Sequence, residues 1–398
     1  MKKVFIPSYG GGHANIMKLL YPLLKKSFDV EILALTLADD IYNNAAIPHN
    51  TIKDYLHIFS EVEQEKITEY GKKLAEVEYN PNSSMHYEDC VSYLGMGMID
   101  LVHKLASIEK AETEFKLYGR KAFCPVNIAH KILQHVRPDI VILSVNVRFE
   151  AAVGIAANKL NIPVLFIQDL PDVYTLPFRA DVCVMNDYTK QIYTKANQKN
   201  VENIFVTGQP VFDQIFNIKD SDIAAVQQYF KLASTTKLIV YLEQSGLNYT
   251  KDVENFLKQE AKLHPNNVYV IKLHPNMLLD DEVLSTTGNC IKIRDINLLA
   301  LLSNTDIVIT QDSTAGLEAA LLGIDMIVTD FDSEFASLDF ASLGLALRAK
   351  SLTELANCLK NLLSNSDEKH QLNESRQSFK SYPNAAVNIS NVIKRIVE

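Results

Sequence analysis

The stretch FIPSYGGGHANIMKLL, residues 5–20, sets three glycines and a histidine between an apolar run and a segment with apolar residues at helical spacing. The apolar run belongs to residues 2–8, whose continuous hydrophobic character predicts a buried strand, and residues 14–27 predict a helix. A buried strand that turns through glycines directly into a helix is typical of a parallel sheet covered by helices on both faces.

The same alternation of strand and helix continues through most of the chain and restarts once. In the first series, further strands are predicted at 29–35, 138–145, 162–169, 180–186 and 202–210, with helices at 149–161 and 187–197. In the second series, strands are predicted at 236–246, 267–275, 289–295, 306–313 and 324–331, with helices near 250–263 and at 297–306 and 314–323. Two series of this kind predict an α/β protein with two Rossmann-like, doubly wound domains.

Chain length supports the same division, because 398 residues are too many for one ordinary hydrophobic core. We expect an N-terminal domain over residues 1–209, ended by the glycine and proline of VTGQP, and a C-terminal domain over 210–375. Residues of about 50–125 are helical in pattern, charged and rich in tyrosine, which predicts an insertion in the first domain that acts as a lid or binds an acceptor. Residues 376–398 are expected to form the C-terminal helix.

Composition excludes several classes of function. The formal charge of −9 argues against a nucleic-acid partner, and no apolar run approaches the roughly 18 residues that a membrane-spanning helix needs. The N-terminus lacks the pattern of a signal peptide, and the five scattered cysteines predict free thiols in a reducing compartment. We therefore expect a cytoplasmic protein, with peripheral contact to the inner membrane as an open alternative.

The glycine loop is the first candidate site. Open parallel sheets bind ligands beyond the carboxyl ends of their strands, so Gly11, Gly12 and His13 are expected at a ligand-binding edge. Glycines let a ligand approach the backbone, and an imidazole can accept a proton near neutral pH. The run lacks the GxGxxG spacing of dinucleotide-binding loops. An ordinary tight turn with a histidine at the helix start is the alternative.

A second candidate site follows two strands of the second series. His274 and Pro275 end the strand of VYVIKLHP, and one unit later Ser313 and Thr314 begin a helix. Capping oxygens and free N–H groups at such a helix start bind phosphates, and Ala315 and Gly316 are expected to keep its first turn slim enough for one to approach. Glu318 lies about one turn further on, where it could accept hydrogen bonds from ribose. The alternative is a plain helix cap beside a structural histidine.

Three further residues follow strands of the first series and are weaker candidates for contact with a sugar or an acceptor: Arg148, Glu150 and Asp169. A surface ion pair or a loop cap would explain them equally well. The sequence has no HxxH, HExxH or DxD motif in a convincing loop and no GxSxG elbow. We therefore expect no metal and no cofactor, and no serine-based hydrolysis, with helix dipoles offsetting the phosphate charge.

Taken together, these motifs resemble those of the GT-B glycosyltransferases, which have two Rossmann-like domains with the active site between them. The GGGH loop is similar to that of cytoplasmic N-acetylglucosaminyl and diacylglycerol glycosyl transferases, which makes His13 a candidate base. The KLHP and DST motifs resemble the His-Pro and Ser-Ser/Thr motifs of bacterial sialyltransferases and related capsule transferases. That resemblance implies that His274, Ser313 and Thr314 hold the donor phosphate, and that the C-terminal helix crosses back to the first domain.

The sialyltransferases also carry an acidic pair followed by glycine, one member of which is the general base. The matching stretch here is Glu243-Gln244-Ser245-Gly246, so Glu243 alone could fill that role. The resemblance implies a CMP- or UDP-linked sugar donor and a glycan or lipid-linked acceptor in surface polysaccharide synthesis, with His13, Glu243 and His274 as catalytic candidates. The sequence is also similar to non-hydrogenating UDP-N-acetylglucosamine 2-epimerases, which remain an alternative, as does a nucleotide-binding scaffold without catalysis.

Overall fold

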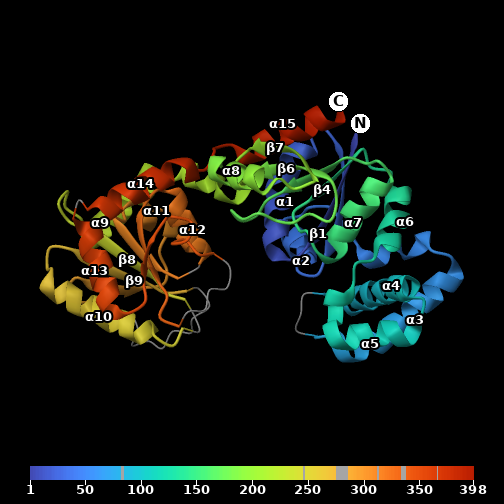
Figure 1. Ribbon diagram of the computed structural model, residues 1–398, viewed down its shortest axis with the longest axis horizontal. Coiled ribbons are helices and arrows are strands. Elements are labelled where there is room, and N and C mark those ends of the chain that lie inside the picture. The colour runs from blue at the N-terminus through green and yellow to red at the C-terminus, as the bar shows by residue number, and fades with distance from the viewer. Residues whose placement is uncertain (82–84, 245–246, 275–285, 312, 333–337, 365) are drawn as a thin grey trace. The chain divides into compact units, whose positions relative to one another are not determined.

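The protein is described here by a computed structural model that covers residues 1–81, 85–244, 247–274, 286–311, 313–332, 338–364 and 366–398 (Figure 1). The chain forms two compact units. Unit 1 consists of Met1–Asp213 together with Tyr382–Glu398, and unit 2 consists of Gln214–Ser381.

Unit 1 is built on a seven-stranded parallel sheet with the order β3-β2-β1-β4-β5-β6-β7. Its strands are β1 (Lys3–Tyr9), β2 (Asp29–Leu35), β3 (Asn50–Thr51), β4 (Ile140–Leu143), β5 (Val164–Ile167), β6 (Ala180–Val184) and β7 (Val201–Val206). Most residues of the inner strands are buried, because helices cover both faces of a parallel sheet. The strand order reverses between β1 and β4, which is where a doubly wound sheet opens a crevice for ligands.

The helices of unit 1 fall into two groups. Those that cover the sheet are α1 (Gly11–Leu24), α2 (Ala38–Asn44), α6 (Val126–Val136), α7 (Arg148–Lys159), α8 (Asp187–Ala196) and α15 (Ala385–Val397). Between β3 and α6 lie the 3₁₀ helices η1 (Ile52–Ile58) and η2 (Gly119–Ala122) with α3 (Glu61–Glu78), α4 (Tyr87–Leu105) and α5 (Ile108–Tyr118). Figure 1 shows α3, α4 and α5 as a helical group beside the sheet of unit 1. This group coincides with the segment for which an insertion is expected.

Helix α15 joins unit 1 although it ends the chain. Its buried residues Ile389 and Ile393 share a core with residues of α1. The Asp213 carboxylate accepts hydrogen bonds from the first N–H groups of α15, those of Ala385 at 2.9 Å and Ala386 at 3.4 Å. Gly208 passes beneath this segment with a φ of 81°, and a Cβ atom there would lie 2.3 Å from the carbonyl oxygen of Tyr382. Only glycine fits this crossing.

Unit 2 has a second seven-stranded sheet with the order β10-β11-β9-β8-β12-β13-β14, parallel except for the short pairing of β10 with β11. Its strands are β8 (Leu238–Leu242), β9 (Val268–Lys272), β10 (Thr286–Thr287), β11 (Cys290–Ile293), β12 (Ile307–Thr310), β13 (Asp325–Thr329) and β14 (Leu347–Ala349). Its helices are α9 (Asp220–Phe230), α10 (Thr250–Leu263), α11 (Leu298–Ser303), α12 (Thr314–Leu321), α13 (Leu352–Leu363) and α14 (Asp367–Phe379), and the 3₁₀ helix η3 (Pro210–Asn217) spans the boundary. The strand order reverses between β8 and β12. The predicted fold class, two doubly wound α/β sheets, is confirmed.

Candidate functional site

Unit 2 contains a cavity of about 880 Å³ at the carboxyl ends of β8, β9 and β11, next to the start of α12. This is the switch point of the sheet, where doubly wound folds bind ligands. The residues that line it come from four neighbouring segments at or just beyond the ends of β8, β9, β11 and β12: Leu242, Glu243, Gln244, Lys272, Leu273, His274, Arg294, Asp295, Ile296, Leu298, Ser313, Thr314, Ala315 and Glu318. The structure therefore brings His274, Ser313, Thr314 and Glu318, which the sequence analysis selected as one candidate site, to one cavity. Pro275 and Gly246 were selected with them and lie outside the described residues.

The start of α12 is a capped helix N-terminus. Ser313 is the N-cap residue, and its Oγ accepts a hydrogen bond from the backbone N–H of Gly316 at 3.0 Å. The same Oγ lies 3.0 Å from Oγ1 of Thr310. With its hydroxyl engaged in this way, Ser313 contributes chiefly by fixing the helix start, and the N–H groups of Thr314 and Ala315 are the groups that a phosphate would meet.

Gly316 corrects one expectation. A Cβ atom at this position would lie 2.9 Å from Cε2 of Phe340 and 3.0 Å from Cγ2 of Thr310. Both neighbours are fully buried, so glycine is needed to pack α12 against the core. The expectation that Gly316 makes room for a phosphate is wrong, because its missing side chain faces the interior.

Glu318 lines the cavity from the second turn of α12. Burial raises the pKa of its carboxyl to about 7, and a hydrogen bond from Nε2 of Gln214, at 3.3 Å, acts in the opposite direction. The carboxyl group is thus poised to change charge near neutral pH, in a position that suits contact with hydroxyl groups of a ligand.

Glu243 lies in the cavity wall, and its side chain is only 1% exposed. It follows Tyr241 on the face of the sheet that packs against α10, and its Oε2 lies 3.6 Å from Nζ of Lys292, which also pairs with Glu254 at 2.5 Å. Burial raises the pKa of Glu243, and the Lys292 charge lowers it. Such enclosure beside a lysine suits a structural charge pair better than a base that must reach an acceptor hydroxyl.

The sequence analysis missed four polar residues of this cavity, Gln244, Lys272, Arg294 and Asp295. Gln244 accepts a hydrogen bond from the backbone N–H of Gln311 at 3.1 Å, which ties the end of β8 to the end of β12. Lys272 is the last residue of β9, and Arg294 directly follows β11 and pairs with Asp295 at 3.3 Å. A lysine or arginine at the carboxyl end of an otherwise apolar strand was the available signal.

In unit 1, the glycine loop leads straight into α1. Gly10 is the N-cap residue with a φ of 93°, and Gly11 and Gly12 already form the first turn. A Cβ atom at Gly12 would meet no described atom within 4 Å, and one at Gly11 would make only ordinary contacts. The positive φ therefore explains Gly10 alone, while Gly11 and Gly12 leave an open backbone surface at a helix N-terminus.

His13 and Asp169, selected from distant segments, meet at the switch point of unit 1. Nδ1 of His13 lies 3.9 Å from Oδ2 of Asp169, and the two side chains are 22% and 25% exposed. Oδ1 of Asp169 accepts hydrogen bonds at 2.8 Å from the hydroxyl of Tyr174 and from the backbone N–H of Leu170. Burial lowers the pKa of His13, and the Asp169 charge raises it. The imidazole is thus a half-buried base candidate with an oriented carboxylate beside it.

Glu150 is fully buried, and within the described part of the chain its hydrogen bonds all come from backbone N–H groups. Its Oε1 accepts from Tyr9 N at 2.8 Å, and its Oε2 accepts from the N–H groups of Ser144 and Val145 at 3.0 and 2.9 Å. Burial raises the pKa of Glu150 to about 8, and these three donors counteract that effect. Glu150 therefore joins the ends of β1 and β4, which assigns it to support of the loop rather than to ligand contact.

Arg148 begins α7 with a φ of 55°, an uncommon conformation for a residue with a side chain. Its Nη1 donates to the hydroxyl of Tyr9 at 2.7 Å, and its guanidinium lies 5.1 Å from the centroid of the Tyr9 ring. Backbone strain of this kind is concentrated at functional sites. Here the strained residue carries the partly exposed guanidinium that lies beside the glycine loop.

The described residues contain no group of three or more histidines, cysteines or acidic residues arranged to hold a metal ion. None of the described helices combines the length and the apolar composition that crossing a bilayer requires. All five cysteines are free thiols, and Cys90, Cys183 and Cys290 among them are buried.

The fold is that of an α/β protein with two doubly wound sheets and a cavity at the switch point of the second, and comparison with known sequences gives the family. Residues 179–398, more than half of the chain, match the model of the family described as CDP-glycerol:poly(glycerophosphate) glycerophosphotransferase. The chain belongs to this family of transferases. No protein of curated function matches the sequence.

Solved structures resemble the whole chain at low sequence identity. The S. aureus MnaA–UDP co-structure has a TM-score of 0.55 at 14% identity and covers 99% of this chain and 96% of its own. The Neisseria meningitidis UDP-GlcNAc 2-epimerase bound to UDP-GlcNAc has a TM-score of 0.55 at 15% identity over 99% and 100% of the two chains. The glycosyltransferase SnogD from Streptomyces nogalater has a TM-score of 0.50 at 15% identity over 100% and 99%. The chain has the GT-B fold of these proteins.

Proposed function

We propose that this protein transfers the activated group of a nucleotide-linked donor to an acceptor hydroxyl, and that the nucleotide binds in the cavity of unit 2. The observation that carries the proposal is the convergence of His274, the N-terminus of α12 and Glu318 on one cavity at the switch point. The family match supports a transferase, and its description names a CDP-linked donor, so a cytidine nucleotide is the first candidate.

In this proposal, the transferred group is a sugar or a polyol phosphate. In either transfer the nucleotide phosphate is the leaving group. Its negative charge grows as its bond to the transferred group breaks. His274 and the N–H groups at the start of α12 are placed to stabilise that charge. Glu318 would bind ribose. A glycan or lipid-linked acceptor in surface polysaccharide synthesis completes the proposal, and no metal is required by it.

His13 is the proposed general base. Nδ1 of His13 is buried without a hydrogen-bond partner among the described residues and lies 3.9 Å from Oδ2 of Asp169, and in this proposal Nε2 accepts the proton of an acceptor hydroxyl. Asp169 would then stabilise the imidazolium that forms. This arrangement favours His13 over Glu243, whose side chain is enclosed beside Lys292.

The test is calorimetric titration of the protein with CMP, CDP, UDP and pyrophosphate, followed by turnover assays with CDP-glycerol, CMP-sugar and UDP-sugar donors. His274→Ala should weaken nucleotide binding or turnover by roughly 10- to 150-fold, because it removes a charge-assisted contact to phosphate. Thr314→Ala should have a smaller effect, and Glu318→Ala should weaken nucleotides but not pyrophosphate. His13→Ala should lower turnover by roughly 100-fold and leave nucleotide binding unchanged.

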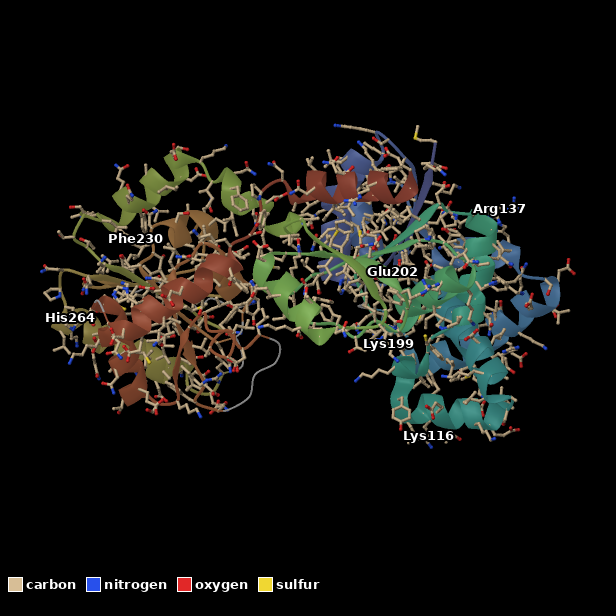
Figure 2. All side chains as sticks on the ribbon, turned by 45° about the horizontal axis from the view of Figure 1, so that its top comes forward. Lys116, Arg137, Lys199, Glu202, Phe230 and His264 are labelled. Carbon is tan, nitrogen blue, oxygen red and sulfur yellow. The ribbon has the colours of Figure 1, made fainter. Side chains whose placement is uncertain are left out.

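His264→Ala is the matched control. His264 follows α10, its side chain is 52% exposed, and Figure 2 shows it at the outer end of that helix. Normal binding and turnover by His274→Ala, equal to the His264→Ala control, would refute the proposed site. Isomerisation of a UDP-sugar without any acceptor would instead establish the epimerase alternative, and tight nucleotide binding with no turnover of any donor would establish the scaffold alternative.

A further inference from the structure

Lys272 is a buried cation in the cavity of unit 2. It is the last residue of β9, and the whole residue is only 9% exposed. Its register partners are Leu242 on β8 and Ile293 on β11, so its aliphatic stem lies between two apolar neighbours. Its ammonium donates a hydrogen bond to the carbonyl oxygen of Leu273 at 2.8 Å. An ammonium can donate three hydrogen bonds, so its capacity to donate exceeds this one acceptor.

The other charged residues of the cavity are already paired or close to neutral. Arg294 pairs with Asp295 at 3.3 Å, and Glu243 pairs with Lys292 at 3.6 Å. Glu318 has a pKa raised to about 7. Within the described parts of the chain, no carboxylate oxygen lies within 4.0 Å of Nζ of Lys272. A buried charge without a counter-ion lowers the stability of the free protein. A protein retains such a charge where a bound ligand supplies the opposite charge.

We infer that Lys272 is the principal counter-charge for the phosphates of the bound nucleotide. This inference rests on the proposed function. It adds Lys272, which lies on a strand, to His274 and the start of α12 as a contact of the phosphates. The ligand chemistry that it implies is a nucleoside diphosphate or diphosphate ester, because one ammonium held within the cavity and the N–H groups of α12 can share a diphosphate.

Protonation offers an independent sign of this contact. Burial lowers the pKa of Lys272, the Asp295 charge raises it, and the Arg294 charge lowers it further. A bound phosphate favours the charged ammonium and so raises that pKa. Between the pKa values of the free and bound states, nucleotide binding therefore takes up protons, and affinity falls as the pH rises. The titratable and charged groups that face the same cavity, and that must be considered with it, are Glu243, His274, Arg294, Asp295 and Glu318.

The experiment compares the wild-type protein with Lys272→Met and Lys272→Arg, with Lys251→Met on the exposed face of α10 as the control. CDP, pyrophosphate and cytidine are titrated by calorimetry. Lys272→Met should weaken CDP and pyrophosphate by roughly 10- to 100-fold and leave cytidine unchanged, and Lys272→Arg should restore part of the loss. Calorimetry of CDP at a series of alkaline pH values, in buffers of different ionisation enthalpy, should show proton uptake by the wild type and less by Lys272→Met.

Stability without ligand separates this role from a structural one. Without nucleotide, Lys272→Met should melt at a higher temperature than the wild type, because it removes a buried ammonium that forms no ion pair within 4.0 Å with a described residue. Equal CDP affinity in the wild type and Lys272→Met would overturn this inference and leave the proposed function standing. A loss of CDP affinity accompanied by an equal loss for cytidine and a lower melting temperature would also overturn it, because it indicates a structural role. A wild type that binds neither CDP nor pyrophosphate would overturn both.

Discussion

Asp169→Asn should lower the pKa of His13, and the structure sets the size of the effect. Asp169 contributes to His13 through its charge, at 3.9 Å between Nδ1 and Oδ2. Asparagine can keep the Oδ1 contacts to Tyr174 and to the backbone of Leu170, so the variant removes the charge with little change in geometry. The pair is thus well suited to a test of electrostatic coupling that needs no substrate.

Two unit charges at this separation interact by about 1 kcal/mol in a water-like dielectric and by about 4 kcal/mol at an effective dielectric constant of about 20. Because both side chains are partly exposed, we expect an interaction energy near the lower end of this range. Removing the Asp169 charge removes this stabilisation of the imidazolium, so the pKa of His13 should fall measurably. In turnover assays, the weaker base should reduce the rate of the transfer step.

The assay is an NMR titration of histidine-labelled protein, with the His13 resonance assigned from its loss in His13→Gln. Asp172→Asn is the control, because Asp172 is a neighbouring carboxylate in the same loop whose Oδ1 accepts from the backbone N–H of Val173. A pKa of His13 in Asp169→Asn within about 0.2 units of the wild-type value would refute the coupling, since even the water-like estimate predicts more. Such a result would remove the reason to prefer His13 as the base.

Two further predictions concern Glu318 and the crossing of the C-terminal segment. The pKa of Glu318 is raised to about 7, so its carboxyl group ionises between pH 6 and pH 8. If the carboxylate binds ribose, the affinity for CDP should rise over this range in the wild type, roughly tenfold more than in Glu318→Gln. Parallel pH profiles of the two proteins would contradict the ribose contact. In thermal unfolding, Gly208→Ala should destabilise the protein by more than about 2 kcal/mol, because the strain of a positive φ and a clash with Tyr382 add to one another. Gly119→Ala, also at positive φ but with no described atom near its Cβ position, should cost about 1 kcal/mol. Equal losses in the two variants would show that the chain at Gly208 relaxes freely.

The fold was predictable because its signals are local. The strand-forming runs, such as IVI at 307–309 and LIVYL at 238–242, are continuously apolar and are followed by helical patterns, so each βα unit can be recognised alone. The positions of His274 and Ser313 at strand ends follow from the same pattern, since the carboxyl ends of parallel strands share one edge. That is why these residues could be placed in one site before their distances were known.

The remaining features depend on contacts between distant segments. His13 meets Asp169 only because β4 and β5 follow β1 in the sheet order, which no local pattern reveals. Glu243 directly follows β8 and Lys272 ends β9, but strand register turns the first toward α10 and leaves the second among apolar partners in the cavity. The role of Gly316 is set by Phe340, far along the chain. Sequence patterns identify strand ends, and tertiary packing decides which side chains face a ligand.

The central claim is that the cavity of unit 2 binds the nucleotide of an activated donor. The most direct measurement is a crystal structure of the protein grown with CDP at a concentration that calorimetry shows to be saturating. The proposal predicts density for the diphosphate at the start of α12, next to His274, with the ribose near Glu318. Saturating CDP bound elsewhere on the protein, with the space between Ser313 and His274 unfilled, would contradict it.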